Sequence, residues 1–121
     1  MPLDLYMVGL LPRDMEKSLA FYRQLGLELP ADSEGRPHVQ VQMKGDITFF
    51  LNSMIPLDRQ HAQGVVLEFY VRDRAIVEAK YAELTGLGYH SYQAPNFSET
   101  INAYFAMIND PDGNIVMLTA D

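Results

Sequence analysis

The stretch Asp110-Pro111-Asp112-Gly113-Asn114 separates two apolar runs, Ala103 to Ile108 and Ile115 to Leu118. Pro111 fixes its φ angle at about −65°, as the first central position of a turn requires, and Gly113 readily adopts a positive φ. Asp and Asn also tolerate turn conformations. The stretch therefore predicts a hairpin that makes the two apolar runs neighbouring strands near the end of the chain.

A calcium loop is an alternative reading of the same stretch. Asp110, Asp112 and Asn114 match the first three ligand positions of an EF-hand loop, but the glycine at its sixth position and the glutamate at its twelfth are missing. A plain turn is the preferred interpretation.

A second informative segment lies near the N-terminus, from Asp14 to Gly26. Asp14 is a good helix N-cap and Gly26 suits the position that ends a helix. Met15, Leu19 and Tyr22 recur at helical spacing, so one face of the predicted helix is apolar.

The order of predicted elements occurs twice along the chain. In the first half a strand at residues 3–11 precedes the helix, and short strands are expected at 27–29, 38–43 and 47–51, followed by a long connection at 53–63. A shift of 59 positions places Asp14 on Asp73 and Tyr22 on Tyr81. The second half thus starts with a strand at 65–71 and a second helix, which predicts an internal repeat.

Each half has the order βαβββ, and such a unit alone leaves one sheet face and its edges uncovered. We therefore expect an α+β fold in which the tandem βαβββ modules form an eight-stranded curved sheet, a cup, with the helices outside. The prediction is a single domain, residues 1–121, made of two repeats at about 1–58 and 59–121. The concave face of the cup is the expected ligand site.

Composition restricts the partners. The chain of 121 residues has no cysteine, which excludes disulfides and cysteine-ligated zinc, and it has nearly half apolar residues, as expected for a globular domain. Its nine basic residues are scattered and its net charge is −7, so nucleic acid is not an expected partner. No run approaches the ~20 apolar residues of a membrane span and no signal peptide is evident, so we expect no membrane partner and a cytoplasmic location.

The two segments together resemble the vicinal oxygen chelate superfamily, which includes glyoxalase I, extradiol dioxygenases, fosfomycin-resistance enzymes and bleomycin-resistance binding proteins. The resemblance is carried by Asp14-Met-Glu-Lys-Ser-Leu-Ala-Phe-Tyr-Arg-Gln-Leu-Gly26 and by Asp110-Pro-Asp-Gly-Asn-Ile-Val-Met-Leu118. It implies the tandem-module fold and a homodimer. It does not decide the chemistry.

The metalloenzymes of this superfamily carry His, Glu or Gln at corresponding strand positions of the two halves. The resemblance places these positions at Met7, Val66, Phe50 and Met117. A thioether is a weak ligand for the expected metals, and Val and Phe have no lone pair to donate. We therefore expect no metal and no cofactor.

Strand alternation predicts a cup lined by Met7, Phe50, Val66, Ile115 and Met117, with Glu68 and Tyr70 as polar groups. Tyr104 is a further candidate for ligand binding, as a hydrogen-bond donor. These side chains could form an adaptable apolar pocket or fill the cup as core. His38, His61 and His90 show no metal-ligand spacing and are interpreted as surface or satisfied histidines.

The preferred hypothesis is a metal-free binding protein of the glyoxalase/bleomycin-resistance type that sequesters a small, partly apolar molecule. One alternative is a metal-independent isomerase or lyase with Glu68 as general base and Tyr70 or Tyr104 as donor. The others are a metal-dependent glyoxalase-like enzyme with an atypical ligand set, and a regulatory or scaffold dimer without a ligand.

Overall fold

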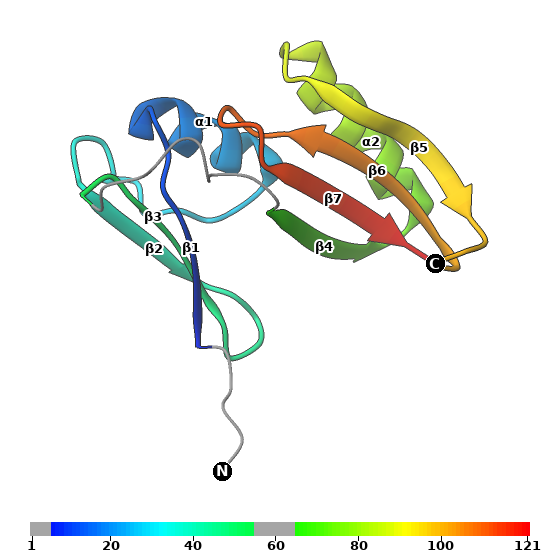
Figure 1. Ribbon diagram of the computed structural model, residues 1–121, viewed down its shortest axis with the longest axis horizontal. Helices are drawn as coiled ribbons and strands as arrows, with labels where there is room; N and C mark the ends of the chain where they lie inside the picture. Colours follow the sequence, from blue (N-terminus) through cyan, green and yellow to red (C-terminus); the bar gives the residue numbers. More distant parts are fainter. Residues whose placement is uncertain (1–5, 55–64) are drawn as a thin grey trace. The chain divides into compact units, whose positions relative to one another are not determined.

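The computed structural model describes residues 6–54, which belong to one compact unit, and residues 65–121, which belong to a second (Figure 1). Within this described part of the chain there are two helices and seven strands in two sheets. The α+β class is confirmed. Neither described helix is long and apolar enough to cross a membrane.

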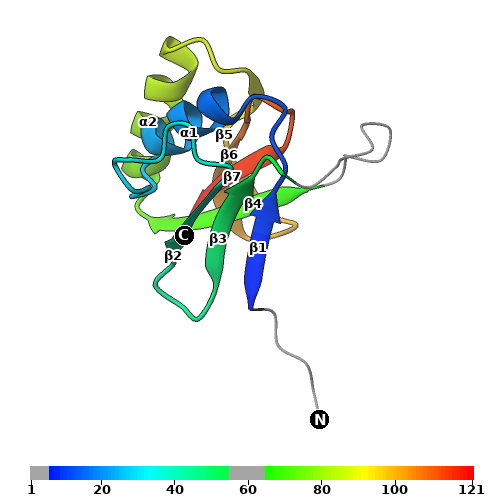
Figure 2. The same ribbon diagram turned by 90° about the vertical axis from the view of Figure 1, so that its left-hand side faces the viewer.

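The first unit has the order β1 (Met7–Leu10), α1 (Met15–Leu25), β2 (His38–Gln42) and β3 (Thr48–Asn52). Its three strands lie in the order β1-β3-β2, as Figure 2 shows. β3 is central, because it pairs in parallel with β1 and in antiparallel fashion with β2.

Helix α1 begins and ends as the sequence predicts. The side chain of Asp14 accepts a hydrogen bond from the Lys17 amide at 3.1 Å, and Gly26 closes the helix with φ of 123°. The apolar face buries Tyr22, whose ring lies 5.2 Å from the ring of Phe49 on β3. This contact shows which face of the first sheet carries the helix.

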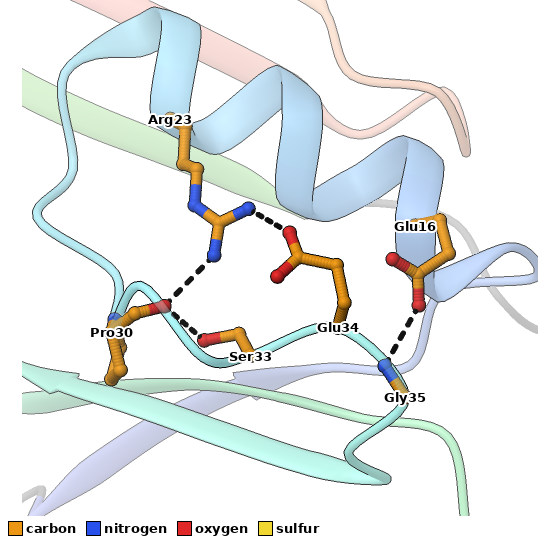
Figure 3. A network of polar contacts seen from close by, with 6 residues as sticks. All are labelled: Glu16, Arg23, Pro30, Ser33, Glu34 and Gly35. Carbon is orange, nitrogen blue, oxygen red and sulfur yellow. Dashed lines mark hydrogen bonds and ion pairs between the residues drawn. The ribbon is translucent and has the colours of Figure 1, made fainter.

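The strand predicted at residues 27–29 is absent, and a loop takes its place. Pro30 and Pro37 cannot donate to a strand ladder, and side chains hold the loop to α1 instead (Figure 3). Arg23 pairs with Glu34 and donates to the Pro30 carbonyl at 2.8 Å, and the Gly35 amide donates to Glu16 at 3.2 Å. The first unit is therefore βαββ within the described residues, and the predicted eighth strand is wrong.

The second unit has the complete predicted order: β4 (Val66–Arg72), α2 (Arg74–Gly86), β5 (Ser91–Ser98), β6 (Ala103–Asn109) and β7 (Ile115–Ala120). Its strands lie in the order β4-β7-β6-β5, and α2 packs on one face of this sheet (Figure 1). The core of this unit includes Val77 and Leu84 of α2 and the fully buried sheet residues Ala106, Ile108 and Val116.

The predicted hairpin joins β6 to β7. The Asp110 carboxylate accepts hydrogen bonds from the backbone amides of Asp112 and Asn114 and from the Asn114 side-chain amide, at 2.8–2.9 Å, and Gly113 has φ of 89°. Since these N–H groups occupy the buried carboxylate, the turn interpretation is confirmed and the calcium-loop alternative is not supported.

The strand registers support the internal repeat. Met7 pairs with Thr48 in the first unit, and Val66 pairs with Ile115 in the second. β1 and β4 are thus equivalent at a shift of 59 residues, whereas the last strands, β3 and β7, are equivalent at a shift of 67. Each unit contributes its own sheet. Their union into one cup remains a prediction, as does the single-domain organisation.

Candidate functional site

In the second unit all the candidate residues except Tyr104 lie on the sheet face opposite α2, which we call the helix-free face of that unit. Register pairs place Val66 beside Ile115, Glu68 beside Met117 and Tyr70 beside Thr119. The Thr119 hydroxyl lies 3.2 Å from a carboxylate oxygen of Glu68 and 3.4 Å from the Phe69 carbonyl, and it can donate to either. Glu68 is exposed and Thr119 is buried. On this face the exposed Glu68 carboxylate therefore lies beside the exposed Val66 and the buried Met117.

Sequence reasoning missed two residues of this face. Phe105 pairs with Thr119 and Met107 pairs with Met117, so β6 extends the helix-free face with an aromatic ring and a thioether. The run from Ala103 to Ile108 is apolar at every position, and alternation could not show which of its residues face the helix.

Tyr104 lies on the opposite, helix-covered face. Its hydroxyl donates to Glu78 of α2 at 2.6 Å, and the Arg74 guanidinium carbon lies 5.0 Å from the centre of its ring. The hydrogen bond to Glu78 raises the pKa of Tyr104. Phe105, the next residue of β6, lies on the helix-free face, and successive residues of a strand point to opposite faces. The prediction that Tyr104 joins Glu68 as a hydrogen-bond donor is therefore wrong.

Tyr70 is on the predicted face, but its hydroxyl already has a partner. It donates to the side chain of Asp121 at 2.9 Å, which raises the pKa of Tyr70, and Arg74 donates to the Asp121 carbonyl at 2.7 Å. Tyr70 is 58% exposed. A ligand would have to compete with Asp121 for this hydroxyl.

The first unit also has a helix-free face, the side of its sheet opposite α1, and its residues differ from those on the helix-free face of the second unit. Phe49 points to α1, so the next residue, Phe50, points away from it and lies over its register partner Gly9. His38 and Gln40 of β2 share this face, with the His38 ring centre 5.1 Å from that of Phe50. An aromatic ring thus stands among polar side chains.

The hydrogen bonds around His38 favour one tautomer of its ring, with the hydrogen on Nε2. The Met54 amide donates to the Asn52 side-chain oxygen at 2.8 Å, which turns the Asn52 NH₂ group towards His38 Nδ1 at 2.9 Å. Since an NH₂ group only donates, Nδ1 accepts, and His38 Nε2 carries the hydrogen that it donates to Gln40 Oε1 at 3.2 Å. Sequence reasoning interpreted His38 as a surface or satisfied histidine. It is exposed and both ring nitrogens are hydrogen-bonded, but its place beside Phe50 was not predicted.

The remaining histidines are apart from these faces or outside the described residues. His90 Nδ1 lies 2.7 Å from the Asn109 side-chain oxygen, in the polar contact beside the β6–β7 hairpin. His61 and most of the predicted connection at 53–63 lie outside the described residues.

The residues at the family's metal-ligand positions do not fit a divalent metal. By register, Met7 and Phe50 in the first unit are related in the same way as Val66 and Met117 in the second. Two thioethers, a phenyl ring and an isopropyl group occupy these four places in the described structure. Within residues 6–54 and 65–121, no three His, Asp or Glu side chains gather as a possible metal site.

A sequence profile of the Glyoxalase/Bleomycin resistance protein/Dioxygenase superfamily matches residues 5–118. No curated protein sequence is significantly similar to the chain.

Solved structures share the fold at low identity. A hypothetical protein from S. aureus is 22% identical with a TM-score of 0.77, over 100% of this chain and 95% of that chain. A glyoxalase/bleomycin resistance protein/dioxygenase family enzyme from Burkholderia phytofirmans is 20% identical with a TM-score of 0.77, over 98% of both chains. A lactoylglutathione lyase from Agrobacterium tumefaciens is 22% identical with a TM-score of 0.70, over 98% of this chain and 94% of that chain.

Proposed function

Because this chain belongs to the Glyoxalase/Bleomycin resistance protein/Dioxygenase superfamily, we propose that it binds a small, partly apolar molecule without a metal, as a sequestering protein. The observation that carries this proposal is the residue set at the four ligand positions. Met7, Phe50, Val66 and Met117 offer apolar contact and no ligand suited to Zn²⁺, Ni²⁺, Mn²⁺ or Fe²⁺.

Glu68 is the proposed polar contact for the ligand. It is exposed on the helix-free face of the second unit, and the Thr119 hydroxyl lies beside one of its carboxylate oxygens. Met117 and Met107 follow it across the sheet, and flexible thioethers adapt to irregular ligands. This arrangement favours a molecule with an apolar body and a cationic or hydrogen-bond-donating group.

The first experiment combines elemental analysis with native mass spectrometry of the purified full chain. We expect far less than one Zn, Ni, Mn or Fe per chain after dialysis against a chelator, and a small organic molecule released from the native protein on denaturation. About one retained metal per chain would overturn the proposal in favour of a metal-dependent enzyme with an atypical ligand set.

Glu68→Gln then tests the contact, using the co-purified molecule. We expect it to weaken binding by about 1 to 3 kcal/mol, the usual scale for a hydrogen bond to a charged group. Glu99→Gln, at an exposed glutamate in the β5–β6 turn, is the matched control and should leave affinity unchanged. Equal affinity of the Glu68 variant and the wild type would remove Glu68 from the site.

A metal-independent isomerase or lyase is the second candidate. The contact between Thr119 and one Glu68 oxygen favours it, because the other oxygen is then oriented and available as a general base. In that case Glu68→Gln should abolish turnover of the bound molecule while its affinity changes little. Loss of affinity without any turnover in the wild type would contradict this candidate.

A further inference from the structure

The ring of Phe50 lies flat on the backbone of Gly9. A side chain at position 9 would place its Cβ 2.0 Å from Phe50 Cζ, 2.2 Å from Cε2 and 2.4 Å from Cε1. Three nearly equal distances mean that the Cβ would meet the face of the ring, since an approach in the plane of the ring would leave Cζ much the nearest. One face of the ring therefore rests on β1. The other face points away from the sheet, and the His38 ring lies offset beside it, 5.1 Å from the Phe50 ring centre to centre at an interplanar angle of 33°.

The position of this ring is central and its surroundings are polar. Phe50 is the middle residue of β3, the central strand, with Gly9 on one side and Gln40 on the other. Gln40, His38 and Gly9 are exposed, whereas Phe50 is half-buried. A flat apolar surface is thus bordered by hydrogen-bonding groups.

One of these groups is oriented as a donor. His38 donates to Gln40 Oε1, so the Gln40 NH₂ group is directed away from that bond, and it has no hydrogen-bond partner within the described part of the chain. This NH₂ group stands on the residue that pairs with Phe50. A molecule stacked on the ring could accept a hydrogen bond from it without leaving the ring face.

We propose that Phe50 is a stacking surface for a planar, conjugated group that carries a carbonyl acceptor, which Gln40 recognises. This inference rests on the proposed metal-free binding function and names the class of its ligand. An aromatic ring over a strand glycine can also serve only to cover the backbone. The test must therefore distinguish recognition of a flat ligand from a covering role.

The experiment compares two neutral carboxamides that differ in flatness, 2-naphthamide and decahydronaphthalene-2-carboxamide. Each is titrated into the full chain and followed by backbone amide and Phe50 ring signals in NMR. We expect 2-naphthamide to shift the signals of Gly9, Gln40 and the Phe50 ring and to bind about 2- to 12-fold more tightly than the saturated amide, as aromatic pairing predicts.

Two variants on the same strand complete the design. Phe50→Leu should abolish the preference for the flat amide, and Phe49→Leu, on the helix-covered face, should keep it. Should Phe50→Leu fail to fold, the shifts mapped on the wild type still decide the matter.

Equal affinity for both amides, signals that move only within residues 65–121, or no shift at all would overturn the inference. Equal binding of both at Phe50 would leave metal-free binding intact, whereas a retained stoichiometric metal would overturn the proposed function itself.

Discussion

Gly9→Ala introduces one methyl group at the position where the Phe50 ring rests. The added Cβ would lie 2.0 Å from the ring, and carbon atoms pack best at about 3.5 Å or more, so the ring would have to move by about 1.5 Å. The clashing atoms belong to the far end of the Phe50 side chain, so the ring can rotate outward while the strand pairing is kept. We expect destabilisation of about 1 to 3 kcal/mol, the usual cost of overpacking.

The effect of Gly9→Ala should depend on whether Phe50 is present. In a Phe50→Ala chain the obstacle is gone, and Gly9→Ala should be neutral or stabilise by about 0.5 to 1 kcal/mol, because alanine loses less backbone entropy than glycine on folding. The double-mutant cycle should therefore give a coupling energy of at least about 1 kcal/mol between the two positions.

Urea unfolding of the four chains measures this coupling. Gly45→Ala is the control, since no atom lies within 4 Å of a Cβ placed there and its φ is not positive. An equal effect of Gly9→Ala in the wild-type and Phe50→Ala chains would refute the contact between the Phe50 ring and Gly9, and with it the stacking surface.

Tyr104→Phe should reduce the loss of stability above about pH 10. The hydrogen bond to Glu78 raises the pKa of Tyr104 in the folded chain, so its contribution to stability is fully present below the pKa of an unfolded tyrosine and is lost as the pH rises through the pKa of the folded state. Urea midpoints from pH 8 to 11 measure it, and identical pH profiles would argue against the Glu78 contact. Arg23→Gln should speed amide hydrogen exchange in the loop at residues 27–37 with little change in global stability, and unchanged exchange would show that the side-chain contacts do not hold the loop. The family resemblance implies a homodimer, so sedimentation at micromolar concentration should give twice the 13.7 kDa of the chain, and a monomer alone would contradict it.

Local signals in the sequence predicted most of the fold. The Asp14 cap, the Gly26 stop and the turn at Asp110–Asn114 each depend on a few neighbouring residues, and all three are found. The strand expected at 27–29 is too short for periodicity to decide, and its fate depends on contacts such as that of Arg23 with Glu34, 11 residues away. Such contacts leave no periodic pattern.

The candidate site was less accessible to sequence reasoning. Alternation placed Glu68 on the face of Met117, but β6 is apolar at successive positions, so Tyr104 was assigned to the wrong face and Phe105 was missed. The seating of Phe50 on Gly9 depends on a rotamer and on the pairing of two strands about 40 residues apart, and neither is written in the local sequence.

The hydrogen bonds of the β6–β7 hairpin also bear on the chemical ageing of the protein. Asp-Gly sequences such as Asp112-Gly113 rearrange to isoaspartate when the glycine amide nitrogen attacks the aspartate side chain. Here that amide donates to the Asp110 carbonyl at 3.0 Å, and the Asp112 amide is held by the Asp110 carboxylate at 2.9 Å. The folded turn thus withholds the attacking nitrogen, so isoaspartate at position 112 in peptide maps should accumulate only as fast as the hairpin opens.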